Sequence, residues 1–435
     1  MKKGLVIGGV IVLLAAAAGA LFAFAESDQT KAIKDVLENG RVPSAKEQDL
    51  LDLDDDSTIT KKDLMKAKFD AALHKNSEMP LFYQPTAAKQ LGRTAYHEDT
   101  ETLWFSLSGS GIEFRFMGEN CSFTLVGDSA CTQGETVAPR YAYYVDGELK
   151  EKTQLTEPER TVSIEGSAAD YKTVRIVKLS ESAQSSMGIR DLCVEKNDGD
   201  GESGLSATDP APHLIEFIGD SITCGYGVDG EFNKDKFMTA NEDAEKAYAI
   251  KTAKKLGADY SLVSYSGHGI LSGYTSDGTL NKTQLVPKYY TQVGHASPVI
   301  EERHKIQDDE WDFSVQPDLI VINLGTNDAS YTVTSSPRQK EFAEKYTEFL
   351  KLIREKNPNA PILCTLGIMG TTLCDAIDLA VSNYTQETGD TNISTMRFDM
   401  QQDADGYAVD WHPSEKTHEK ASDKLTAYIK DWLKW

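Results

Sequence analysis

The sequence predicts an α/β domain over residues 213–435, preceded by a β-rich domain over residues 85–197. From Leu214 onward, short apolar runs alternate with longer amphipathic segments. This alternation is typical of βαβ units, in which a mostly parallel sheet carries helices on both faces. In the earlier region, apolar and polar residues alternate in short runs between glycines. That spacing has the period of strands and favours a β-sandwich.

The α/β domain is expected to consist of strands that each lead into a helix. The expected strands span 214–218, 260–264, 318–323 and 361–366, and the expected helices span 242–256, 337–356, 371–387 and 415–433. Parallel strands joined in this way present their carboxyl ends at one edge of the sheet, where ligands bind.

In the β-rich domain, residues 103–107 and 112–116 show the alternation most clearly, and Asp146-Gly147 marks a turn. Residues 198–212 are rich in glycine, aspartate and serine and contain two prolines. This composition predicts a flexible linker between the two domains.

The N-terminal residues 1–25 have the form of a targeting segment. Two lysines precede an apolar stretch from Gly4 to Phe24, and Ala23-Phe24-Ala25 offers a small-x-small cleavage site. The stretch is also long enough to span a bilayer, so an uncleaved anchor is the alternative. Both readings predict export, with the protein either extracellular or anchored at the cell surface.

Composition limits the partners. With 68 acidic and 45 basic residues the formal net charge is −23, which argues against nucleic acid or an anionic membrane surface because phosphate is repelled. A neutral polysaccharide is compatible with this charge.

Six cysteines are too few for a disulfide scaffold. Cys121 with Cys131, or Cys364 with Cys374, can form a disulfide that closes a loop. In the alternative, all six are buried thiols.

The segment 219–227, Gly-Asp-Ser-Ile-Thr-Cys-Gly-Tyr-Gly, carries the main functional signal. It follows the predicted strand 214–218, so Ser221 lies at a strand end, where an α/β sheet presents reactive groups. Cys224 in the same segment is expected to pack as a small apolar residue.

Three later segments fall at comparable places, at 263–269, 320–328 and 410–413. A serine hydroxyl is a weak nucleophile that needs a base within hydrogen-bond reach, and His412 is a candidate. The oxyanion formed by attack on an ester needs preorganised donors. A glycine amide of the second segment, the Asn327 side chain and the Ser221 amide are suitable.

The order Gly-Asp-Ser, a glycine block, Gly-Thr-Asn-Asp and Asp-Trp-His-Pro resembles the SGNH or GDSL-type hydrolases, and most closely carbohydrate esterase family 2. The resemblance covers roughly residues 85–435. It implies a flavodoxin-like hydrolase domain after a jelly-roll β-sandwich. It also implies an esterase that removes O-acetyl groups from xylan or glucomannan, with no metal or other cofactor in the chemistry.

Matched to the family's motifs, Ser221 is the nucleophile, His412 the base and Asn327 the oxyanion asparagine. The oxyanion glycine is Gly269, with Gly267 as second choice. Asp410 lies two residues before the histidine instead of three. In an extended segment residues two apart face the same side, so Asp410 can orient the imidazole; in the alternative, a backbone carbonyl does so and leaves a Ser–His dyad.

Trp411 and His268 are candidate substrate contacts; for Trp411 a core position is the structural alternative. His418, inside the last helix, is expected on the surface.

Residues 52–63 fit a twelve-residue calcium loop. The candidate ligands are Asp52, Asp54, Asp56, the Thr58 carbonyl and Asp63. Serine replaces the usual turn glycine, and a solvated acidic helix start is the alternative. Together with a preceding helical stretch, residues 26–80 resemble half of a dockerin, which would imply a cohesin-type scaffold as a partner.

Overall fold

The computed structural model describes residues 28–39, 43, 51–53, 58–61, 63–64, 66–67, 80–197 and 203–435. The predicted targeting segment 1–25 lies outside these residues and stays a prediction. Within the described residues, no helix is long and apolar enough to cross a membrane.

A five-stranded parallel sheet forms the centre of the C-terminal domain. Its strands are β11 (Leu214–Gly219), β12 (Asp259–Ser264), β13 (Leu319–Asn323), β14 (Ile362–Ile368) and β15 (Ile393–Met400), in the order β12-β11-β13-β14-β15. The first four match the expected strands. The edge strand β15 is absent from the prediction because most of its side chains are only half-buried or exposed, which leaves no apolar run.

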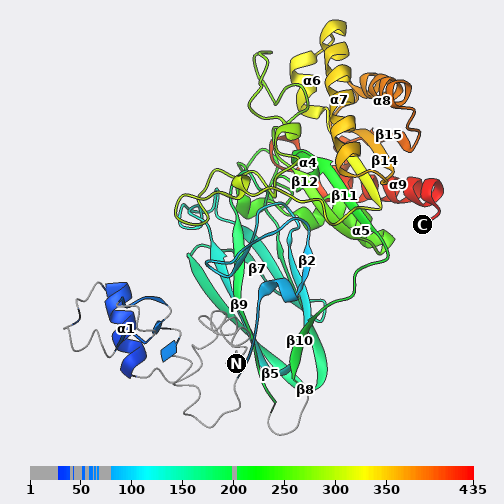
Figure 1. Ribbon diagram of the computed structural model, residues 1–435. Coiled ribbons are helices and arrows are strands. Elements are labelled where there is room, and N and C mark those ends of the chain that lie inside the picture. The colour runs from blue at the N-terminus through cyan, green and yellow to red at the C-terminus, as the bar shows by residue number, and fades with distance from the viewer. Residues whose placement is uncertain are drawn as a thin grey trace, which may run out of the picture.

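Helices cover both faces of this sheet (Figure 1). One face packs against α5 (Tyr248–Leu256) and α9 (Glu415–Leu433), and the other against α7 (Ser336–Lys356) and α8 (Cys374–Thr388). Successive residues of β13 point to opposite cores: Ile320 lies with α7 and α8, and Val321 with α5 and α9. Both faces of the strand are therefore buried, which is why its sequence is apolar throughout.

Short helices complete the chain. They are α1 (Asp28–Asn39), α4 (Ser221–Cys224) and α6 (Thr326–Thr332), with 3-10 turns that include Ala244–Lys246, Ile306–Asp308 and Val409–Trp411. The expected helix 242–256 is interrupted, because Asp243 caps the turn Ala244–Lys246 before α5 begins.

The preceding domain is one ten-stranded antiparallel sheet. Its strands are β1 (Leu81–Tyr83), β2 (Lys89–Leu91), β3 (Ala95–His97), β4 (Thr102–Phe105), β5 (Gly111–Gly127), β6 (Arg140–Val145), β7 (Glu148–Gln154), β8 (Glu159–Lys178), β9 (Met187–Glu195) and β10 (Gly204–Ala207). The predicted fold class, a β domain before a parallel α/β domain, is confirmed. The prediction of a flexible linker over 198–212 is wrong in part, since residues 204–207 of this segment form β10, which pairs with β5.

All six cysteines are free and buried, so neither predicted pairing forms. Cys121 and Cys224 are fully enclosed, and burial raises their pKa values well above the usual range, which keeps them as neutral thiols.

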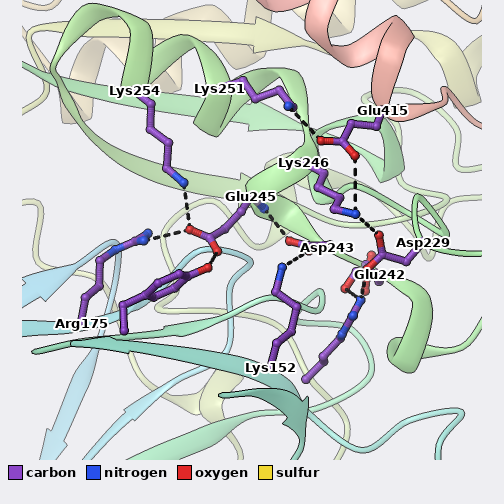
Figure 2. A network of polar contacts seen from close by, with 12 residues as sticks. Lys152, Arg175, Asp229, Glu242, Asp243, Glu245, Lys246, Lys251, Lys254 and Glu415 are labelled. Carbon is purple, nitrogen blue, oxygen red and sulfur yellow. Dashed lines mark hydrogen bonds and ion pairs between the residues drawn. The ribbon is translucent and has the colours of Figure 1, made fainter. Parts of the chain in front are cut away.

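Charged side chains join the two domains. In the network of Figure 2, Lys152 of β7 contacts Asp243 at 2.7 Å and Arg175 of β8 contacts Glu245 at 2.8 Å. Asp243 caps the turn Ala244–Lys246 before α5, and Glu245 lies within it. The β domain therefore holds the segment that leads into the first long helix of the α/β domain.

A second link is fully buried. Arg93, from the loop between β2 and β3, lies 3.0 Å from Glu216 in β11 and also donates to the Gln292 carbonyl at 2.9 Å. The other Glu216 oxygen accepts from the Tyr290 hydroxyl at 2.9 Å. Because Arg93 is fully buried and Glu216 nearly so, each charge depends on the other for compensation.

We expect Arg93→Met to lower the free energy of unfolding by about 3–5 kcal/mol, because it leaves the Glu216 carboxylate buried without a counter-charge. The measurement is urea unfolding followed by tryptophan fluorescence. The control is Arg93→Met with Glu216→Gln, which removes the charge and keeps an oxygen for Tyr290; it should recover most of the loss. If Arg93→Met alone is as stable as wild type, the Glu216 carboxylate does not depend on Arg93 for compensation.

Candidate active site

Strand register brings the predicted site segments together. Gly219 at the end of β11 lies opposite Ser264 of β12 and Asn323 of β13. Ser221, the loop after β12 and the helix that contains Asn327 therefore emerge side by side at the carboxyl edge of the sheet. This is the position expected for a ligand site in a parallel sheet.

Ser221 and His412 are in direct contact, although 191 positions apart in the chain. The Ser221 Oγ lies 2.8 Å from His412 Nε2. Ser221 is the first residue of α4, whose N-cap Asp220 accepts from the Ile222 amide at 3.0 Å. His412 Nδ1 donates to the Val409 carbonyl at 3.1 Å. This bond fixes the tautomer in which Nε2 carries a lone pair toward the hydroxyl.

The Asp410 carboxylate makes no hydrogen bond with the imidazole, so the prediction that it orients His412 is wrong, and the Val409 main-chain carbonyl takes its place. The prediction assumed an extended segment. Residues Val409–Trp411 instead form a 3-10 turn in which Asp410 and Trp411 have φ values of 52° and 65°. These left-handed conformations rotate the Asp410 side chain away, and they are sparsely populated by non-glycine residues.

The Asp410 carboxylate accepts from the Tyr226 hydroxyl at 2.9 Å. The Tyr226 ring stacks on His412 with centroids 4.1 Å apart. The hydrogen bond of the Asp410 carboxylate therefore goes to Tyr226, which packs against one face of the imidazole.

Trp411 is not a core residue, since 57% of it is exposed. Its ring contacts Phe232 and Tyr407 at centroid distances of 4.5 and 5.1 Å. Trp411, the residue before His412, therefore presents an exposed indole that is supported by two further rings.

The two candidate glycine amides differ in their hydrogen bonds. The Gly269 amide already donates to the Gln284 carbonyl at 3.1 Å, so it is not free for an oxyanion and the first choice is wrong. The Gly267 amide has no acceptor within the described part of the chain, and Gly267 has a φ of 75°, which glycine tolerates without strain. The second choice, Gly267, is therefore the available donor.

Asn327 lies where the prediction requires. Its Nδ2 donates to the His268 carbonyl at 2.8 Å and makes a long contact of 3.4 Å with Asp220. The first bond holds the side chain at the loop after β12. The second N–H, in the longer contact, is the weaker of the two and the one that can turn to a substrate oxygen.

Two buried carboxylates that the prediction missed hold this loop. Asp328 accepts from the amides of Leu271 and Ser272 at 2.7 and 2.8 Å. Glu181, from the β domain, accepts from the Ser266 amide at 2.8 Å, directly before Gly267. Asp328 directly follows Asn327 in the Gly-Thr-Asn-Asp motif, so the sequence could have indicated that it lies at the site. Nothing in the sequence connects Glu181 to this loop.

Burial sets the charge of the site. It lowers the pKa of His412 to about 4, so the imidazole is neutral at pH 7. It raises the pKa of Asp220 to about 7 and that of Asp328 to about 6. A neutral imidazole with a free Nε2 lone pair is the form that accepts a proton.

Two other histidines are placed differently from the prediction. His268 is 4% exposed, with its ring among Tyr265, Tyr289 and His295, so it contributes its carbonyl to Asn327 and no open substrate surface. His418 is buried and not on the surface, and its Nδ1 accepts from the Tyr248 amide at 3.2 Å. Helix α9 turns this residue toward α5.

The candidate calcium loop is described only in part, since Asp54 and Asp56 lie outside the described residues. Asp63 is buried, and its two oxygens accept from the amides of Leu53 and Thr60 at 2.5 and 2.7 Å. Asp52 and Thr58 lie near the start and the middle of the loop. Calcium binding and the dockerin-like segment stay predictions.

A serine–histidine pair at the carboxyl edge of a parallel sheet, with amide donors beside it, defines the class of GDSL-type hydrolases. Family models agree with this. Residues 217–420 match the GDSL-like lipase/acylhydrolase family, and residues 90–199 match the carbohydrate esterase 2 N-terminal domain. The chain belongs to carbohydrate esterase family 2, with that N-terminal domain joined to a GDSL hydrolase domain.

Known proteins share this arrangement. The chain is 31% identical over 338 residues to the cellulase/esterase CelE of Acetivibrio thermocellus, and 29% identical over 232 residues to an acetylxylan esterase/glucomannan deacetylase of Cellvibrio japonicus. These matches cover 75% and 52% of this chain, but only 37% and 60% of the relatives. A solved family two carbohydrate esterase from Clostridium thermocellum, in complex with cellohexaose, is 28% identical with a TM-score of 0.65, covering 80% of this chain and 99% of that one.

We expect Asp410→Ala to lower kcat/KM on 4-nitrophenyl acetate by less than about tenfold, because the Val409 carbonyl accepts from His412 Nδ1 and the Asp410 carboxylate makes its hydrogen bond to Tyr226 instead. His412→Ala should lower it by more than about a thousandfold. Tyr226→Phe, which removes the hydroxyl but keeps the stacked ring, is the matched control and should resemble Asp410→Ala. Equal losses for Asp410→Ala and His412→Ala would contradict the dyad.

Proposed function

We propose that this protein is a carbohydrate esterase that removes O-acetyl groups from plant cell-wall polysaccharide, xylan or glucomannan, with Ser221 as nucleophile and His412 as base. The observation that carries the proposal is the 2.8 Å contact between Ser221 Oγ and the lone-pair nitrogen of a neutral His412. The similarity to esterases named for acetylated polysaccharide supports the substrate class.

In the proposed reaction, Ser221 Oγ attacks the acetyl carbonyl carbon while its proton passes to His412 Nε2. The imidazolium then gives that proton to the leaving sugar oxygen, which departs as a hydroxyl and leaves acetyl-Ser221. A water molecule, deprotonated by His412, attacks the carbonyl carbon of this ester; the imidazolium then returns the proton to Ser221 Oγ as the acyl–oxygen bond breaks and acetate is released. The Val409 carbonyl, which accepts from Nδ1–H at 3.1 Å, stabilises the imidazolium in both steps.

The oxyanion of each tetrahedral intermediate is assigned to three donors: the amides of Ser221 and Gly267 and the Nδ2 of Asn327. Ser221 begins α4, so its amide has no partner inside the helix. Asp328 and Glu181 act as positioning residues, because each fixes loop amides on either side of Gly267. Donors held in place before the reaction need no reorganisation as charge develops.

The exposed ring of Trp411 is assigned to the sugar, as a stacking surface beside the reacting serine. We also propose that the protein acts outside the cell or at its surface, on the basis of the apolar N-terminal segment. A polymeric substrate is consistent with that location.

The deciding experiment compares acetate release from acetylated xylan and acetylated glucomannan by wild type and Ser221→Ala. The wild type should release acetate, and Ser221→Ala should lose essentially all of it while its unfolding curve is unchanged. Equal release by the two proteins would overturn the mechanism. Polysaccharide binding without turnover by the wild type would favour a carbohydrate-binding module whose esterase activity is secondary.

The pH dependence of kcat/KM reports the base. Because burial lowers the pKa of His412 to about 4, we expect activity to persist below pH 6 and to fall only as the imidazole gains a proton near pH 4. The measurement is kcat/KM on 4-nitrophenyl acetate between pH 3.5 and pH 8, with unfolding monitored at each pH. Asp220→Asn is the control, since a change near pH 7 that this variant abolishes belongs to Asp220. A loss centred at pH 6.5 in both proteins would contradict a neutral, buried base.

A further inference from the structure

A group of histidine and carboxylate side chains lies away from the active site, where the β domain meets the long connection between β12 and β13. His97, the last residue of β3, comes from the β domain. His304 and Asp309 come from the connection, on either side of the turn Ile306–Asp308. Their ligand atoms lie within 4.8 Å of one another, and none of them takes part in the reaction proposed above.

We propose that His97, His304 and Asp309 bind a divalent transition-metal ion of the zinc class. The ligand atoms are His97 Nε2, His304 Nε2 and an Asp309 carboxylate oxygen. Imidazole nitrogen suits zinc, whereas calcium and magnesium select oxygen ligands.

The distances agree with such an ion. Asp309 Oδ1 lies 2.9 Å from His304 Nε2 and 3.3 Å from His97 Nε2. In a tetrahedral zinc site with bonds of about 2.0–2.1 Å, neighbouring ligand atoms are about 3.3 Å apart. Small side-chain shifts would therefore convert the present contacts into coordination without moving the backbone.

A second carboxylate already orients one of the ligands. Glu301 Oε2 accepts from His97 Nδ1 at 2.8 Å, which turns Nε2 toward Asp309. Glu301 is itself held by the Trp104 indole at 2.7 Å, and its backbone joins that of His304 in a tight turn. A carboxylate behind a ligating histidine is the usual outer-shell partner of a zinc site.

Solvent has access to these ligands. A pocket of about 870 Å³ is lined by them and by neighbouring polar residues. The His304 side chain is 38% exposed, so an ion can enter and a water molecule can complete the coordination.

Bound there, the ion would join β3 of one domain to the connection that contains Tyr290 and Gln292 of the other. It would add a third link to the two charged links described above and stabilise the folded state in which both domains are docked.

The test is Zn²⁺ titration of the full chain by calorimetry after chelator treatment and removal of the chelator, in excess Ca²⁺ so that any site at residues 52–63 is already satisfied. We expect a single tight site per chain and a rise in melting temperature. His304→Ala should weaken binding at least about 100-fold and abolish the rise, and Glu301→Gln should weaken binding about 10–100-fold. Glu98→Gln, an acidic neighbour in the same pocket, is the matched control and should bind as wild type.

Absence of Zn²⁺ binding by the folded wild type would overturn the proposal, as would binding that His304→Ala leaves unchanged. A loss equal in His304→Ala and Glu98→Gln would also overturn it, because it would indicate attraction by the acidic surface alone. Since the His304 side chain is half-buried at the edge of the pocket, its replacement should lower the melting temperature of the metal-free protein only slightly. None of these outcomes depends on the esterase activity.

Discussion

The parallel pairing of β11 with both β12 and β13 is the constraint on which the rest of the site depends. Because Gly219, Ser264 and Asn323 lie in one row across the sheet, the three chain segments that follow them leave from the same edge. Each segment then needs only a few residues to bring Ser221, Gly267 and Asn327 together. A shift of register in either pairing would separate them by at least one residue spacing of about 3.3 Å.

The β domain takes part in holding this edge. Arg93 compensates the carboxylate of Glu216 inside β11, and Glu181 fixes the loop that carries Gly267. The ion pairs of Figure 2 attach the segment that leads into α5. Each of these contacts includes a buried carboxylate, so loss of its partner removes the hydrogen bond or counter-charge on which that carboxylate depends. The antiparallel domain is thus a structural support of the hydrolase domain as well as its neighbour in the chain.

The turn before α9 decides how the histidine is held. Two consecutive left-handed residues, Asp410 and Trp411, cost of order 1–3 kcal/mol each, and the surrounding structure maintains them. The turn places the Val409 carbonyl behind His412, sends the Asp410 carboxylate to Tyr226 and leaves Trp411 exposed. One local conformation therefore sets the support of the base, the packing of its ring and the aromatic surface beside it.

Much of this was readable from the chain alone. The period of the apolar residues determines the strands β11 to β14 and the long helices, because both faces of a parallel sheet must be buried. The motifs around Ser221, Asn327 and His412 predict the candidate site residues, because each motif follows or precedes such an element. The edge strand β15 and the short strand β10 were not predicted, since half-exposed or short strands show little periodicity in their apolar residues.

Tertiary structure alone decided the rest. Gly267 rather than Gly269 has the open amide because Gln284, from a distant turn, occupies the other. Asp410 faces away because of the sign of two φ angles, which residue spacing does not encode. Glu181 and the group of His97, His304 and Asp309 join segments from separate domains. Sequence patterns reflect interactions between residues that are close along the chain. These contacts instead depend on how helices, strands and loops that are distant in the chain pack against one another.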